Sequence, residues 1–229
     1  MMNFIEHYLP NVVPIWNGDG GFVQAIWQTL YMTIVTMIVS AIIGLILGVL
    51  LVLWDDHGLL QNHVAYFILD KIVNIFRAIP FIILLAVMYP VTHAIVGTGI
   101  GATAALVPLI GGTAPFFARQ VQNALVTVDP GVIEAAEAMG ISPMGIVFRV
   151  YLREGLGELV RVTVLTVISV VGLTAMAGAV GGGGLGNMAI AMGYQRFQND
   201  VVWVATILIL IMVFVFQFVG DIITRKLQH

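Results

Sequence analysis

The sequence of 229 residues contains no cysteine and very little charge. Without cysteine, neither disulfide bonds nor thiolate metal sites can form. Charged residues make up 9% of the chain, whereas soluble domains carry about 25%. Apolar residues make up 60%, and the mean hydropathy is +1.03. This composition predicts an all-α protein that crosses a membrane several times.

Motifs for catalysis and nucleotide binding are also missing. The glycine-rich run from Gly178 to Gly186 is not followed by the Lys and Ser or Thr of a phosphate-binding loop. No HExxH motif, serine nucleophile elbow or pair of carboxylates within an apolar run occurs. The chain is therefore predicted not to be an enzyme, and to hold no cofactor or metal ion of its own.

Basic residues are absent from the start of the chain, since the first Lys or Arg is Lys71. A cleavable secretory signal needs a basic region at its start, so none is predicted. Residues 1–22 are interpreted instead as a short amphipathic segment on the extracytoplasmic side.

The chain contains several long apolar runs. A helix crosses a bilayer core with about 20 mostly apolar residues. We predict five membrane-spanning helices, at about residues 23–53, 72–96, 99–125, 160–180 and 201–221. Prolines are predicted to kink the second and third spans, because neighbouring helices can satisfy the freed carbonyls. These prolines are Pro80, Pro90, Pro108 and Pro115.

The basic residues orient these spans. If the loop between spans three and four is cytoplasmic, eight of the nine Lys and Arg residues lie on or near that side, and only Arg196 lies outside. Residues 23–225 then form one transmembrane domain with an external N-terminus, and residues 226–229 form a cytoplasmic tail. Arg77 and Arg119 are interpreted as anchors whose charges reach the headgroups.

Residues 129–158 form the largest polar feature and hold five of the twelve acidic residues. Asp129-Pro130 is a helix start, and Gly140 is placed to end that helix in a left-handed conformation. Ser142-Pro143 repeats the start signal. The second helix carries apolar residues spaced as one stripe, which are Met144, Val147, Phe148, Tyr151 and Leu152.

This cytoplasmic helix-turn-helix allows two interpretations that the residues alone do not separate. Its apolar stripe fits a groove on a soluble partner, and a pair of helices lying on the bilayer surface fits equally well. A DNA-binding helix-turn-helix is disfavoured, because the loop is acidic and tethered between spans. No nucleic-acid partner is predicted.

The sequence Glu134-Ala135-Ala136 is followed by three residues and Gly140, and then after nine more by Val150-Tyr151-Leu152. This resembles the EAA loop of ABC-importer permeases, whose pattern is EAA, three residues, G, nine residues and I-x-L-P. Arg153 stands where that proline is usual, so the second helix is expected to continue further before it bends toward span four. The resemblance implies that the loop is a coupling element that docks on a cytoplasmic ATPase. The coupling residues that it implies are Glu134, Ala135, Ala136, Met139, Gly140, Met144, Val147, Phe148 and Leu152.

Four further segments look like the methionine-importer permeases of this family, namely FRAIPFIILL (76–85), VGTGIGATAALVPL (96–109), APFFARQVQNAL (114–125) and AGAVGGGGLG (177–186). The resemblance implies a type I ABC-importer permease fold in a bacterial inner or plasma membrane. It also implies two ATPase subunits, which bind ATP and Mg²⁺, and an extracytoplasmic substrate-binding lipoprotein. A homodimer is expected besides, because five spans are too few to enclose a pathway.

The resemblance also implies that the end of span four lines the translocation pathway. Candidate pathway or gate residues are Met176, Gly178, Pro108 and Phe116, and plain packing is the alternative reading of such residues. The last part of the glycine-rich run is interpreted as a loop leaving span four on the outer side. The predicted function is translocation of an amino acid, methionine, by alternating access. The alternatives are another amino acid, such as cystine, and a passive channel.

Overall fold

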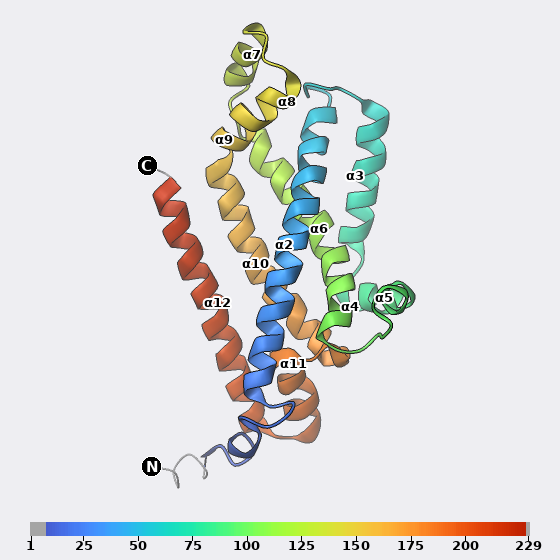
Figure 1. The fold of residues 1–229 in the computed structure, drawn as a ribbon, viewed down its shortest axis with the longest axis vertical. Coiled ribbons are helices and arrows are strands. Elements are labelled where there is room, and N and C mark those ends of the chain that lie inside the picture. Colours follow the sequence, from blue (N-terminus) through green and yellow to red (C-terminus); the bar gives the residue numbers. More distant parts are fainter. Residues whose placement is uncertain (1–7, 228–229) are drawn as a thin grey trace. The chain divides into compact units, whose positions relative to one another are not determined.

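The computed structural model describes residues 8–227, and all regular elements in that range are helices (Figure 1). The chain divides into two compact units. Unit 1 comprises residues 1–37, 80–110 and 167–216, and unit 2 comprises residues 38–79, 111–166 and 217–229. Four long helices contribute residues to both units: α2 (Phe22–Trp54), α6 (Ala102–Val126), α10 (Leu156–Ala177) and α12 (Asn199–Leu227). The first seven residues of the predicted external segment and the last two of the predicted tail lie outside the described range.

Three described helices are long and apolar enough to cross a membrane. They are Phe22–Trp54, Leu156–Gly182 and Asn199–Lys226, with mean hydropathies of 2.9, 2.1 and 2.7. They coincide with the first, fourth and fifth spans predicted from the sequence. The third predicted span corresponds to α6, which begins at Ala102 and continues as one helix past Pro108 and Pro115.

The second predicted span is not a single kinked helix. Residues 72–96 fall into three helices instead: the end of α3 (His63–Ala78), α4 (Phe81–Val87) and α5 (Tyr89–Val96). Pro80 forces the preceding Ile79 into an extended conformation (φ −75°, ψ 121°), which ends α3. Pro90 then stands in the first turn of α5, where its missing N–H costs nothing. The prolines therefore break this segment rather than bend it.

Unit 1 contains the remaining short elements, of which one precedes α2 and the others lie between α10 and α12. They are η1 (Val13–Ile15), η3 (Gly178–Gly182), α11 (Gly184–Asn187), η4 (Met188–Gly193) and η5 (Tyr194–Arg196). The last part of the glycine-rich run, predicted as a loop, forms the short helix α11 instead, and non-helical dihedrals at Val180, Gly181 and Gly183 interrupt the chain before it. Two apolar clusters support this unit, one around Phe22, Leu185 and Val201 and one around Met32, Leu109 and Ala177.

Unit 2 contains α3 and the helices of the polar loop. The latter are α7 (Pro130–Ala138), α8 (Pro143–Ile146), η2 (Val147–Tyr151) and α9 (Leu152–Glu154), which follow one another in Figure 1. Leu51, Val73 and Ala118 form its apolar core. A Cβ added at Gly48 would lie 2.6 Å from the Ala118 carbonyl oxygen. Small residues therefore let α2 and α6 approach closely in this unit.

Arg119 corrects another sequence-based interpretation. Its guanidinium forms an ion pair with Asp70 of α3 and also donates to Asn74 Oδ1 (3.2 Å) and Gln122 Oε1 (2.6 Å). The Arg119 side chain is only 16% exposed. Because its charge is matched inside unit 2, Arg119 joins α6 to α3 and is not a free anchor reaching for headgroups.

Candidate functional site

The first helix of the predicted coupling element is built by local caps. The Asp129 carboxylate accepts the N–H of Gly131 (2.8 Å), and Pro130 occupies the first helical position. Gly140 then adopts φ +75°, and its N–H donates to the Glu137 carbonyl at 2.8 Å. The predicted start and the predicted left-handed stop of this helix are both confirmed.

The second helix continues almost without interruption into α10. Ser142 caps α8 by accepting the N–H of Gly145 (3.3 Å). From Pro143 the helical elements α8, η2 and α9 follow one another to Glu154, and Gly155 alone separates them from α10. Arg153 lies within this stretch. Without the usual proline, the helix continues further, as expected.

The predicted apolar stripe of this second helix is not one face. Val147 and Tyr151 are buried, whereas Met144 and Phe148 are 62% and 64% exposed. The buried face also includes Val150, which the stripe omitted. Residues 147–151 form a π-helical turn, which holds more residues than an α turn and rotates the register away from the 3.6 period.

Three large apolar side chains of the coupling element are exposed. They are Met139, Met144 and Phe148, and we refer to these three side chains as the docking patch; Met139 is 72% exposed. Of the other predicted coupling residues, Glu134, Ala135 and Gly140 are exposed, Leu152 is half-buried, and Ala136 and Val147 are buried. Ala136 and Val147 therefore pack within the unit, while the docking patch is free to meet another surface.

A cavity of about 560 Å³ lies beside α7, within unit 2. Its walls come from the turn after α2, the end of α6, α7 and η2, and its polar lining consists of Asp55, His57, Glu134, Glu137 and Tyr151. Glu134 thus faces a hollow that holds two further carboxylates. Burial, together with the negative charge of Glu137, raises the pKa of Tyr151 above its ordinary value near 10. The Tyr151 phenol therefore stays protonated beside these acids.

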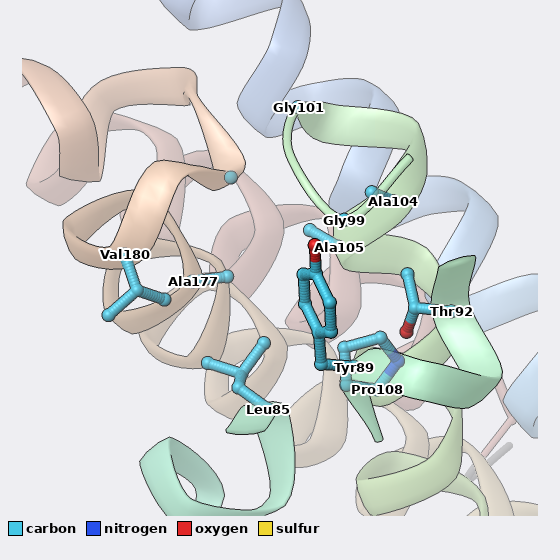
Figure 2. Close-up of a pocket in the computed structure, with 11 residues that line it drawn as sticks. Leu85, Tyr89, Thr92, Gly99, Gly101, Ala104, Ala105, Pro108, Ala177 and Val180 are labelled. Carbon is cyan, nitrogen blue, oxygen red and sulfur yellow. The ribbon is translucent and has the colours of Figure 1, made fainter. Parts of the chain in front are cut away.

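One of the four candidate pathway residues, Pro108, lines a cavity in unit 1. Figure 2 shows Pro108 of α6 beside Tyr89 and Ala177, around a cavity of about 30 Å³. Met176 is 42% exposed and is not part of that lining. Gly178 is buried against the Gly183–Asn187 turn. Met176, Gly178 and Pro108 thus belong to unit 1, and Phe116 belongs to unit 2.

The glycine-rich segment after α10 is held by two side chains that the sequence did not single out. Gln28 Oε1 accepts the N–H of Gly184 (2.7 Å), and Thr29 Oγ1 accepts the N–H of Leu185 (2.9 Å). Both acceptors come from α2. The sequence offered one sign of this contact. Gln28 carries a polar amide near the start of a long apolar helix, where such a group needs a hydrogen-bond partner.

Comparison with known proteins decides the family. The family described as the inner membrane component of binding-protein-dependent transport systems matches residues 57–229. The chain belongs to this family.

Among its relatives, MetP of Bacillus subtilis, a methionine import system permease protein, is 47% identical over 222 residues. The alignment covers 96% of this chain and 97% of MetP. A probable D-methionine transport system permease, MetI of Vibrio cholerae, is 41% identical over 205 residues, covering 90% and 91% of the two chains. The family resemblance read from the EAA loop is thereby confirmed.

Solved structures agree with this assignment to the inner membrane component family. A chain of the MetNI methionine ABC transporter, crystallised in inward-facing conformations, matches with a TM-score of 0.88 and 47% identity, covering 90% of this chain and 95% of that one. A chain of an amino acid ABC transporter with histidines matches with a TM-score of 0.73 at 17% identity, covering 90% of this chain and 93% of that one, and shares the fold alone. The chain has the type I ABC-importer permease fold.

The family match contains the coupling element but begins after α2. The docking patch, the acidic cavity residues of α7 and the glycine-rich segment all lie within residues 57–229. Gln28 and Thr29 lie outside that range, although the alignment with MetP covers nearly the whole chain.

Proposed function

We propose that this chain is the membrane permease subunit of an ATP-binding-cassette importer, and that it translocates methionine. One observation carries the proposal: 47% identity to a methionine import permease over 222 residues, with 97% of that relative covered. The TM-score of 0.88 to a chain of the MetNI transporter supports the same function. The protein is a multi-pass membrane protein and a transporter subunit, not an enzyme in itself.

The proposed topology keeps five crossings within residues 23–225. The three apolar helices supply the first, fourth and fifth crossings, α6 supplies the third, and the interrupted α3–α5 run supplies the second. The ion pair between Arg119 and Asp70 supports a place for α6 inside the bilayer, because paired charges cost less there than single ones. The distribution of basic residues places the N-terminus outside and residues 226–229 in the cytoplasm.

The proposed assembly has two copies of this chain, two cytoplasmic ATPase subunits and an extracytoplasmic substrate-binding lipoprotein. ATP and Mg²⁺ belong on the ATPase subunits, so the chain receives its energy from a partner. The likeness to a chain of MetNI, a methionine ABC transporter, supports the pairing of permease and ATPase. Specificity then resides mainly in the lipoprotein.

The docking patch supports the proposed coupling role of residues 129–158. Thioether and aromatic side chains that are more than 60% exposed can fill an apolar groove on the ATPase. The patch is connected to α10 by helical elements broken only at Gly155. A displacement of Phe148 is therefore passed along a nearly continuous helix to span four, as a rigid-body motion between two states.

Two observations support the proposed pathway residues. Met176 is an exposed thioether close to the end of α10, and Pro108 lines a cavity with Ala177. We keep Met176, Gly178, Pro108 and Phe116 as proposed pathway or gate residues in the assembled dimer.

The test is uptake by proteoliposomes that contain this permease, its ATPase and the lipoprotein. We expect methionine uptake only with ATP inside the vesicles and lipoprotein outside. Uptake of cystine in place of methionine would overturn the substrate. Uptake that persists without ATP would overturn the importer and favour a passive channel.

The docking patch has its own test. Replacing Phe148 with Ser should reduce the amount of ATPase that copurifies with the permease about tenfold, because an apolar anchor is lost from the contact. Phe218→Ser is the matched control, since Phe218 is 67% exposed on α12 and far along the chain from the coupling element. Equal copurification for Phe148→Ser and the unmodified chain would remove the docking patch from the contact.

A further inference from the structure

The short helix α11, at the end of the glycine-rich run, has its first amides capped by side chains of α2. The first amides of any helix lack acceptors within that helix, and the residue before α11, Gly183, offers no side chain. Gln28 and Thr29 of α2 supply the missing acceptors to Gly184 and Leu185, at 2.7 and 2.9 Å. These contacts join positions 156 residues apart in the sequence.

The capping oxygen of Thr29 is held in place by a further hydrogen bond within α2. Thr29 is 2% exposed, and its hydroxyl donates to the Ala25 carbonyl (3.0 Å), which fixes the oxygen toward Leu185. A Cβ added at Gly184 would lie 2.6 Å from Thr29 Oγ1. The backbone of Gly184 therefore approaches Thr29 too closely for a residue with a side chain. On its other side the segment is held by the Gly181 carbonyl, which accepts the N–H of Gly101 at 2.9 Å.

The segment has a backbone conformation that depends on glycine. Gly181, Gly183 and Gly184 have φ values of +95°, +76° and +72°, which glycine adopts without steric cost. Val180 and Gly181 have non-helical dihedrals that kink the chain within residues 178–182, and residues 188–193 form a π-helical turn. Gly184 and Leu185 donate to side chains of α2, and these contacts stabilise this conformation.

We propose that Gln28 and Thr29 form a latch that holds Gly181–Gly184 in the closed state of the outer end of the pathway, and that the latch opens once in each transport cycle. The proposal rests on the proposed function and topology, which place these residues on the extracytoplasmic side. The structure matches a transporter chain crystallised in inward-facing conformations. In alternating access, that state has its outer end closed, and here the latch is engaged.

Loss of one latch contact should shift the balance toward the open outer end. A typical net hydrogen-bond contribution corresponds to about a fivefold change in such an equilibrium. Gln28→Leu and Thr29→Val should therefore each raise ATP hydrolysis without substrate about fivefold, and lower the methionine transported per ATP. Both are positioning residues, so methionine binding to the lipoprotein should not change.

Matched controls lie on the same helix. Thr29→Ser keeps the hydroxyl acceptor and should behave like the unmodified chain. Thr33 is 1% exposed, and its hydroxyl has no hydrogen-bond partner among residues 8–227. Thr33→Val therefore makes the same change of atoms without removing a latch contact. Equal basal hydrolysis in Thr29→Val and Thr33→Val, at or above that of the unmodified chain, would overturn the proposal.

The decisive experiment uses the unmodified complex and does not depend on any variant folding. Amide hydrogen exchange is measured by mass spectrometry on the peptide that contains Gly184 and Leu185, with and without ATP and vanadate. We expect at least fivefold faster exchange of these amides in the ATP-trapped complex. Unchanged protection overturns the latch, even if uptake shows that the complex imports methionine. Failure of methionine uptake overturns the substrate assignment instead, and leaves the exchange result to decide the latch.

Discussion

The coupling element and the glycine-rich segment are both interruptions between helices, yet they are stabilised in different ways. In the coupling element the caps are local: Asp129 and Ser142 accept N–H groups two and three residues further on, at 2.8 and 3.3 Å. In the glycine-rich segment the capping oxygens of Gln28 and Thr29 come from α2, 156 residues away. A locally capped turn keeps its shape when its surroundings move. A remotely capped one depends on the helix that caps it.

The glycines of the two regions differ in the same sense. No atom would lie within 4 Å of a Cβ added at Gly140, so only its left-handed backbone requires glycine. A Cβ added at Gly186 would lie 2.2 Å from the Ala175 carbonyl oxygen. The coupling turn thus has open space at its glycine, while the glycine-rich segment is packed tightly into unit 1. The following predictions test this difference, from the largest effect to the smallest.

The largest effect is expected for Gly186→Ala. The added methyl would collide with the backbone of α10, which cannot yield like a flexible side chain, so the folded state should lose about 3 kcal/mol or more. We expect little monodisperse complex after purification and a lowered melting temperature. Gly172→Ala is the control, because no atom lies within 4 Å of that added Cβ. Comparable yield and melting temperature for the two variants would contradict the close packing.

Gly140→Val should abolish coupling without preventing assembly. A β-branched residue in the left-handed region costs about 1–2 kcal/mol, and the turn between α7 and α8 must change to relieve it. We expect methionine uptake to fall at least tenfold while ATP hydrolysis by the complex continues. Gly157→Val, at a position with no neighbour within 4 Å of its added Cβ, should transport normally. Uptake at the unmodified rate by Gly140→Val would count against a coupling role for this turn.

These differences also explain which features the sequence could predict. Asp129-Pro130, Gly140 and Ser142-Pro143 were readable because each cap and the amide that it binds lie within three residues. The long apolar helices were readable from their hydropathy. The role of Gln28 could not be predicted, because its partner Gly184 is 156 residues away and no local pattern links the two.

Tertiary contacts overrode local patterns in the same way elsewhere. The sequence shows Asp70 and Arg119 as single charges near apolar segments. Their ion pair could not be predicted, because it depends on the packing of α3 against α6 within unit 2. The apolar stripe of the second coupling helix followed a 3.6-residue period, and the π turn at 147–151 changed that period. The structure has a break at Pro80, where the sequence predicted a kink. A proline inside an apolar run is compatible with either, so the sequence alone does not separate them.

Ser142→Ala tests the local caps at a smaller scale. Removing this cap should cost about 1 kcal/mol, and the amide of Gly145 should exchange with solvent about fivefold faster. The amides of Gly184 and Leu185 should keep their protection, because their acceptors come from α2. Ser142→Asp, which keeps an acceptor, is the control. If Ser142→Ala also loosened Gly184, the two regions would not be stabilised independently.

The smallest effect concerns pH and should be confined to the coupling element. Burial, and then the charge of Glu137, raise the pKa of Tyr151 above 10, so the folded state binds its proton more tightly than the unfolded state does. Stability must then fall as pH rises above about 10, where the unfolded chain releases that proton first. Tyr151→Phe lacks this proton. The melting temperature of the unmodified complex should therefore drop more than that of Tyr151→Phe between pH 8 and pH 10.5, while the difference between the two stays constant below pH 9. Parallel curves over the whole range would mean that the acidic cavity beside α7 does not act on Tyr151.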